Sequence, residues 1–145
     1  MPMTFVHGTC VAIDGRGVLL RGPSGSGKSD LALRLIDGGA ILVADDQTAL
    51  DRDGEALIAR PPATIAGLLE VRGLGLVRLP HLDGVALDLV VDLVAPSAVE
   101  RLPEASALEL LGLTLRHLLL APFEASAAAK VRLAMRASTR DIMPP

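Results

Sequence analysis

Short apolar runs separated by glycine, proline or acidic turns make up most of this chain of 145 residues. Runs of this kind, bounded by turn residues, are typical of buried β-strands. The predicted strands cover residues 4–13, 17–21, 41–44, 48–50, 56–59, 85–94 and 114–120. The pattern therefore predicts a strand-rich domain.

Two segments have helical spacing instead. Residues 29–37 form a predicted helix that ends at a Gly38-Gly39 stop. Its apolar positions are Leu31, Leu33, Leu35 and Ile36, with Ala32. Residues 125–137 form the second predicted helix, whose basic side chains gather in the later turns, where the helix dipole favours positive charge. Together these segments predict an α/β fold with one helix early in the chain and one near its end.

Turn signals connect several of these elements. Residues 51–54, Asp-Arg-Asp-Gly, predict a hairpin between the strands 48–50 and 56–59. Residues 70–78 contain Gly73-Leu74-Gly75, and on an extended strand Glu70 and Arg72 would project from the same face. Glycines there allow a ligand to approach closely, whereas the alternative interpretation is a surface ion pair before a glycine turn. Prolines bracket a loop at 96–103 that has short helical possibilities.

Composition narrows the class of protein. Half of the residues are hydrophobic but only Phe5 and Phe123 are aromatic, so the core is predicted to be aliphatic. The length suits one domain over residues 1–145, with a loose tail at 138–145. The net charge of −3 argues against nucleic acid as the main partner. Cys10, the single cysteine, excludes an internal disulfide and is predicted to fill a buried strand.

Targeting signals are not evident in the sequence. The first residues lack the basic and apolar pattern of a signal peptide. The strongest apolar stretch, 85–94, is too short to cross a bilayer and is interrupted by Asp88 and Asp92. We therefore expect a cytoplasmic protein with no membrane contact.

The clearest chemical motif is a phosphate-binding loop of the G-x-x-x-x-G-K-S type. It comprises Gly22, Pro23, Ser24, Gly25, Ser26, Gly27, Lys28 and Ser29. Its glycines let successive backbone N–H groups face phosphate oxygens, Lys28 reaches the β- and γ-phosphates, and Ser29 ligates Mg²⁺. A glycine-rich turn that matches by accident is the alternative. The strand before the loop and the helix after it favour nucleotide binding, since the helix N-terminus would point at the phosphates.

An acidic pair, Asp45-Asp46, follows the predicted strand 41–44. In open α/β sheets this strand end faces the ligand crevice, where a carboxylate can hold Mg²⁺ or accept a proton from an attacking hydroxyl. Adjacent side chains on extended backbone point to opposite faces, so the two aspartates should have different roles. A solvated turn is the alternative interpretation. His7 and Arg101, taken alone, are typical of structural or surface residues.

Taken together, these segments resemble the catalytic domain of HPr kinase/phosphorylase. The matching pieces are His7-Gly8, the loop 22–29, Val43-Ala44-Asp45-Asp46, the signature-like segment Leu69-Glu70-Val71-Arg72-Gly73-Leu74-Gly75, and Glu100-Arg101-Leu102. The match is dense over residues 7–78. Because the family's usual N-terminal domain is absent, the chain resembles the short form found in some proteobacteria.

The resemblance implies a fold similar to the nucleotide domain of phosphoenolpyruvate carboxykinase and an ATP- and Mg²⁺-dependent kinase acting on a serine of the phosphocarrier HPr. It implies that Lys28 and Ser29 bind nucleotide and Mg²⁺, that Glu70 is a further metal ligand and that Asp46 is the proton acceptor. It also implies catalytic positions for His7 and Arg101, an assisting role for Asp45, and a homo-oligomer, specifically a hexamer.

One departure from the family concerns the basic Pro-x-Arg-Pro-Gly-Arg loop before its last helix. Here the corresponding residues, 121–126, contain no arginine and one acid. Loss of positive charge should weaken the handling of inorganic phosphate or phosphoserine, so phosphorylase activity is left open and kinase activity is favoured. Two alternatives remain at this point: a small-molecule kinase of the shikimate type, and a module that binds ATP without transferring phosphate.

Overall fold

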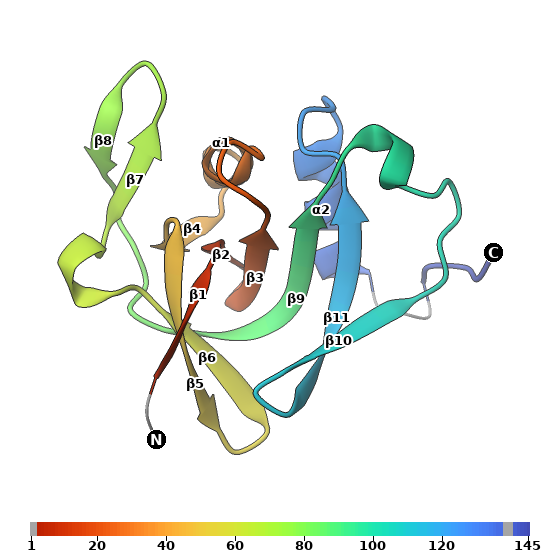
Figure 1. Ribbon diagram of the computed structural model, residues 1–145, viewed down its shortest axis with the longest axis horizontal. Helices are drawn as coiled ribbons and strands as arrows, with labels where there is room; N and C mark the ends of the chain where they lie inside the picture. Colours follow the sequence, from red (N-terminus) through yellow and green to blue (C-terminus); the bar gives the residue numbers. More distant parts are fainter. Residues whose placement is uncertain (1–2, 138–140) are drawn as a thin grey trace.

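The computed structural model describes residues 3–137 and 141–145 as a strand-rich α/β structure with two α-helices in that part of the chain (Figure 1). The strands are β1 (Thr4–His7), β2 (Thr9–Ile13), β3 (Arg16–Arg21), β4 (Ile41–Ala44), β5 (Gln47–Asp53), β6 (Ala56–Arg60), β7 (Leu68–Val71), β8 (Gly75–Arg78), β9 (Val85–Leu93), β10 (Ser106–Leu110) and β11 (Leu113–Leu120). The helices are α1 (Lys28–Asp37) and α2 (Ala127–Arg136), and short 3-10 turns occur at η1 (Ala63–Ile65) and η2 (Pro96–Ala98).

Strand β9 connects the two halves of the main sheet, whose strand order is β1-β5-β6-β9-β3-β2-β4. Its first residues pair antiparallel with β6, and from Leu87 onward it pairs in parallel with β3. Strand β11 pairs in parallel with the other edge of β9, and β10 follows β11 as its antiparallel partner. Figure 1 shows the resulting strong curvature of β9 (green). The carboxyl ends of β3, β9 and β11 consequently lie at one end of the molecule.

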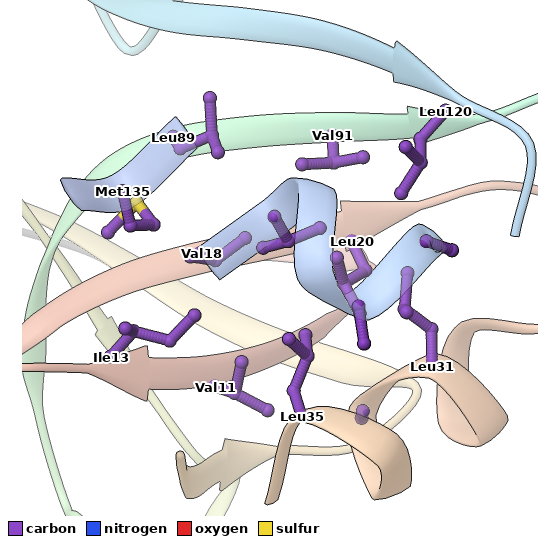
Figure 2. Packing of buried hydrophobic residues seen from close by; sticks show 14 of the residues in the cluster. Val11, Ile13, Val18, Leu20, Leu31, Leu35, Leu89, Val91, Leu120 and Met135 are labelled. Carbon is purple, nitrogen blue, oxygen red and sulfur yellow. The ribbon is translucent and has the colours of Figure 1, made fainter. Parts of the chain in front are cut away.

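Both faces of the central strands are buried, because side chains alternate between two hydrophobic clusters. In β2, Val11 and Ile13 belong to the cluster covered by α1 and α2 (Figure 2), whereas Cys10 and Ala12 belong to the cluster on the other face. Figure 2 shows aliphatic side chains from both helices meeting those of β2, β3 and β9. The core is aliphatic, as the composition predicts. Cys10 is fully buried, and this burial raises the pKa of its thiol to about 12.

Most predicted elements are confirmed. The helices, the strands that became β3, β4, β9 and β11, the β5–β6 hairpin and the helical turn at η2 all occur where the pattern places them, with ends that differ by a few residues. Neither described helix is long and apolar enough to cross a membrane. The predicted loose tail falls partly on residues 138–140, which lie outside the described residues, while residues 141–145 are exposed and carry no helix or strand.

The single strand predicted for residues 4–13 is wrong. The chain forms two strands, because at Gly8 it leaves its pairing with β5 and enters a pairing with β3. The Gly8 amide donates to the Asp46 carbonyl at 2.8 Å. A Cβ at Gly8 would approach Leu19 Cδ1 to 2.9 Å and the Leu20 carbonyl oxygen to 3.0 Å, so the crossing has no room for a side chain. The switch of partner places His7 next to the turn that follows β4.

The placement of Glu70 and Arg72 on one strand is also wrong, although both line the same hollow. Strand β7 ends at Val71, and Arg72 lies in the turn that leads into β8. Gly73 and Gly75 have φ values of 93° and 108°, which favour glycine, so the glycines close a hairpin. Figure 1 shows this β7–β8 hairpin standing out from the body beside α1, which contacts β7.

Candidate functional site

The glycine-rich loop joins β3 to α1, which confirms the predicted strand–loop–helix arrangement. Gly25 and Gly27 have φ values of 83° and 95°, a left-handed conformation that side chains rarely adopt. Helix α1 begins at Lys28 with Gly27 as its N-cap, and the Leu31 amide donates to the Gly27 carbonyl at 2.9 Å. The helix therefore starts inside the loop, with its free N–H groups available to an anion.

Lys28 is buried within this loop, with an exposed fraction of 6%. Its Nζ donates to the carbonyls of Gly22 at 2.7 Å and Pro23 at 3.1 Å. Both partners are neutral, and no carboxylate of the described residues lies within ion-pair distance of Lys28. The loop thus holds a positive charge that protein carboxylates do not neutralise, as a phosphate site requires.

Asp45 connects three separate segments of the site. Its Oδ1 accepts hydrogen bonds from the hydroxyls of Thr9 at 3.0 Å and Ser29 at 2.7 Å. Its Oδ2 accepts from the backbone N–H of Glu70 at 3.0 Å. The carboxylate is buried, and every one of these donors is a neutral group. Asp45 therefore ties the start of α1 and the start of the β7–β8 hairpin to the end of β4.

Asp46 points elsewhere. Its φ of 66° is left-handed, a conformation in which aspartate is enriched, and its side chain is 71% exposed. Oδ1 of Asp46 lies 3.0 Å from Nε2 of His7, whose side chain is about half exposed. The Asp46 amide donates to the Thr9 hydroxyl at 3.1 Å. The side chains of the two aspartates point in different directions, as predicted. The positive φ of Asp46 contributes to this separation, in addition to the alternation of side chains along a strand.

A hollow of about 480 Å³ opens beside the loop. Polar and apolar groups from four parts of the chain line it: Ser24, Gly25, Gly27, Lys28, Ser29, Asp30, Leu33, Asp46, Glu70, Val71, Arg72 and Phe123. Its volume falls in the range of small-molecule sites. Among the predicted residues, Lys28, Ser29, Asp46 and Glu70 therefore meet at one hollow, and Asp45 and His7 contact members of this group.

Arg101 does not join them. It lies exposed between η2 and β10 and does not line this hollow. Its role stays a prediction. Conversely, the structure adds Thr9, which binds both aspartates, and Phe123, which lines the hollow. No sequence signal marks Thr9, whereas the scarcity of aromatic residues could have singled out Phe123.

A second carboxylate network lies directly before the loop. Asp92 of β9 faces Arg21, the last residue of β3, and its two oxygens accept from Arg21 Nε at 2.8 Å and Nη2 at 2.9 Å. His117 Nε2 lies 2.7 Å from Asp92 Oδ2, and the Ser106 hydroxyl lies 3.0 Å from His117 Nδ1. Partial burial disfavours the charged carboxylate, but the hydrogen bonds and positive charges of Arg21 and His117 outweigh it and lower the pKa of Asp92 below its ordinary 3.8.

The sequence of this chain is similar to those of known proteins. The family described as HPr Serine kinase C-terminal domain matches residues 1–122. The HPr kinase/phosphorylase of Bordetella pertussis is 42% identical over 131 residues, which cover 82% of this chain and 42% of that protein. The HPr kinase/phosphorylase of Halalkalibacterium halodurans is 49% identical over 84 residues, which cover 57% of this chain and 27% of that protein.

A solved structure agrees with these matches. The structure of the HPr(Ser) kinase/phosphatase from Coxiella burnetii superposes with a TM-score of 0.78 at 26% identity, covering 92% of this chain and 99% of that one. The chain spans less than half the length of the curated relatives that it matches. Family match, sequence identity and fold agree, and the chain belongs to the family of the HPr serine kinase C-terminal domain.

Proposed function

We propose that this chain is an ATP- and Mg²⁺-dependent protein serine kinase whose substrate is a phosphocarrier of the HPr type. The observation that carries the proposal is that the two aspartates after β4 face different surroundings. Asp45 is buried against the loop serine, Ser29, whereas Asp46 faces the open hollow. Family membership supports the same reaction and a nucleotide domain of the phosphoenolpyruvate carboxykinase-like type. As part of the same proposal, the chain is a single domain over residues 1–145, lies in the cytoplasm and forms a homo-oligomer, specifically a hexamer.

Nucleotide phosphates would be held by the loop and by Lys28. The N–H groups at the start of α1 face the hollow, and the Lys28 ammonium lies on carbonyls that a phosphate oxygen can replace as its partners. Phosphoryl transfer is mainly a matter of position and charge stabilisation. Lys28 supplies that charge where the phosphates would lie.

The residues around Ser29 fit Mg²⁺. The ion prefers hard oxygen ligands and is usually bound by one or two carboxylates together with substrate phosphates. Ser29, Asp45 and Glu70 supply a hydroxyl and two carboxylates, and Asp45 already contacts both Ser29 and the backbone of Glu70. When bound, the ion would neutralise charge on the β- and γ-phosphates. The hydrogen bond from Ser29 to Asp45 orients the Ser29 hydroxyl.

Asp46 is suited to accept the proton of a protein hydroxyl. Its carboxylate is exposed enough for the serine of a folded partner to reach it, and His7 holds one of its oxygens. As the serine oxygen bonds to the γ-phosphorus, its proton passes to Asp46, and the bond from phosphorus to the β,γ-bridging oxygen breaks to release ADP. Phosphoserine and ADP are the products.

Replacing Asp46 tests this assignment. We expect Asp46→Asn to slow phosphorylation of purified HPr about 10²- to 10⁴-fold while the affinity for ATP changes little, because the amide cannot accept the proton. The assay is mass spectrometry of HPr after incubation with ATP and Mg²⁺. Asp53→Asn, in the β5–β6 hairpin outside the hollow, is the matched control. Transfer by Asp46→Asn at the wild-type rate would refute the role of Asp46.

A module that binds ATP without transfer is the second candidate, because residues 121–126 lack the arginines of the family's basic loop. Calorimetric binding of ATP by the wild type, with no phosphoserine on HPr after long incubation, would favour that candidate.

A kinase of the shikimate type normally needs a helical lid with arginine. In residues 3–137 and 141–145 the α-helices are α1 and α2, and both pack against the sheet. A panel of metabolite hydroxyls assayed beside HPr tests this third possibility.

A further inference from the structure

Phe123 is an aromatic side chain in an unusual place. The chain has two phenylalanines and neither tyrosine nor tryptophan, and its core is aliphatic. Phe123 contributes nothing to that core, since 72% of it is exposed. It lines the hollow beside the phosphate-binding loop. An exposed aromatic ring at the edge of a ligand-sized hollow is suited to contact a ligand.

The ring is held against the loop itself. A Cβ at Gly27 would lie 3.0 Å from both Cε1 and Cζ of Phe123 and 3.4 Å from Cβ of Pro122. The edge of the ring therefore packs on the backbone of Gly27, one residue before Lys28. Because Gly27 has no side chain, the ring reaches the loop without displacing it.

The segment that carries the ring is braced. Arg34 of α1 donates through Nη1 to the Glu124 carbonyl at 3.3 Å and through Nη2 to the Pro122 carbonyl. Asp30 holds the same guanidinium, with Arg34 Nε donating to its Oδ2 at 3.1 Å. The residues on both sides of Phe123 are thus fixed to the helix that begins in the loop. Such bracing reduces the entropy that the ring would lose on binding a ligand.

The lining of the hollow has two chemical characters. Lys28, Ser29 and Glu70 suit phosphates and a cation, while Leu33, Val71 and Phe123 present apolar surface. A nucleoside triphosphate has the same two parts, a charged chain and a flat heterocyclic base. The apolar part of the hollow has no use in binding phosphates alone.

We infer that the ring of Phe123 is the stacking platform for the base of the bound nucleotide, an inference that rests on the nucleotide site proposed above. Stacking uses the π-face of a base, and the larger purine ring system covers more of the phenyl ring than a pyrimidine does. Phe123 therefore favours purine over pyrimidine triphosphates.

Binding measurements on Phe123→Ala test the inference. By calorimetry with Mg²⁺, we expect the variant to bind ATP about tenfold more weakly than the wild type, the lower part of the range for base–aromatic stacking. Its affinity for inorganic triphosphate, which has no base, should stay unchanged. Phe123→Tyr keeps a ring and should bind ATP as the wild type does. Phe5→Ala removes the other exposed phenylalanine, on β1 outside the hollow, and is the matched control.

The outcomes separate the two proposals. Unchanged ATP affinity in Phe123→Ala would overturn the stacking role, and so would an equal loss of affinity for ATP and triphosphate, because that result means the ring only supports the loop. Selective loss of ATP affinity in a protein that never phosphorylates HPr would support the stacking role and refute the kinase. Failure of the wild type to bind either compound would refute both.

Discussion

Two carboxylates at the same end of the sheet show how differently one type of side chain can be used. Asp45 follows β4 and accepts hydrogen bonds only from neutral donors, two hydroxyls and one backbone N–H. Asp92, near the end of β9, is held by the Arg21 guanidinium and by His117. Strands β3 and β2 lie between β9 and β4, so the networks flank the glycine-rich loop from two sides.

The difference lies in charge compensation. Hydroxyls and amides orient the carboxylate of Asp45 but leave its negative charge in place, and no Lys, Arg or His of the described residues lies within ion-pair distance of it. The charge of Asp92 is already balanced by Arg21. A buried, uncompensated carboxylate is costly to stability unless a cation joins it, whereas a balanced pair supports the fold. We therefore expect Asp45 to serve function and Asp92 to serve stability.

Of the changes that test this comparison of Asp45 with Asp92, Asp45→Asn is expected to have the largest effect. The amide keeps the size of the side chain but removes the charge that attracts a cation near Ser29. Groups that orient metal ligands typically change metal affinity by about 10- to 100-fold when replaced, so Mg²⁺ dependence of phosphoryl transfer should shift to higher concentration by that factor. Titration of Mg²⁺ in the HPr phosphorylation assay measures the shift.

The same variant should keep most of its stability. Its amide oxygen can accept from the Glu70 N–H, its amide N–H groups can donate to the hydroxyl oxygens of Ser29 and Thr9, and the buried charge is gone, so we expect the free energy of unfolding to change by no more than about 1 kcal/mol. Activity is compared well below the thermal midpoint of the variant. An Asp45→Asn protein with wild-type Mg²⁺ dependence would show that the uncompensated charge has no role in the site, and the comparison with Asp92 would fail.

How much of this site the sequence predicted depends on how local each feature is. The strand, loop and helix around Lys28 were predicted because the motif and the apolar spacing lie within a few consecutive residues. The separation of Asp45 from Asp46 was predicted from the alternation of side chains on a strand. The hydrogen bonds of Asp45 were not, because Thr9 lies 36 residues away and the Glu70 amide 25 residues away. Such partners follow from sheet register, which the local pattern does not specify.

Physical reasons of the same kind explain why the sequence did not predict other features of the structure. Strand β10 was missed because most of its side chains are exposed and it contains Glu109, so it lacks a clear apolar face. The break at Gly8 was missed because both flanking segments have strand-like composition, and only the close approach of Leu19 and Leu20 requires the glycine. Phe123 was not singled out because its role depends on contact with Gly27, far away along the chain.

We expect Asp92→Asn to lower the free energy of unfolding and to leave the Mg²⁺ dependence of phosphoryl transfer unchanged. The change removes a charge-assisted pair of hydrogen bonds with Arg21, and since both side chains are about one-third exposed, we expect a loss of about 1–2 kcal/mol. Urea denaturation at neutral pH measures it. A stable variant with impaired Mg²⁺ dependence would reverse the roles that we assign to the two carboxylates.

Low pH should abolish the difference in stability between the wild type and Asp92→Asn. The pKa of Asp92 is lower in the folded chain than its ordinary 3.8, so its ionised form stabilises the fold above that value, and the contribution disappears as the pH falls through the lowered folded pKa. The gap in unfolding free energy between wild type and Asp92→Asn should therefore be larger at about pH 5 than in stronger acid and should narrow progressively below about pH 4. A gap that widens in acid would mean that the sign of the pKa shift is wrong.

The smallest effect is expected at the outer end of the Asp92 network. The Ser106 hydroxyl contacts His117 but is exposed on β10, so water can replace it when Ser106 is changed to alanine. We expect a loss of no more than about 0.5 kcal/mol in urea denaturation. In a double-mutant cycle with Asp92→Asn, the coupling should be of similar size or smaller, because His117 stands between the two side chains. A coupling above about 1 kcal/mol would show that Ser106, His117 and Asp92 act as one cooperative unit. The stabilising role that we assign to the Arg21–Asp92 pair would then belong to the whole chain of hydrogen bonds, since removing Ser106 at its exposed end would weaken the pair at its other end.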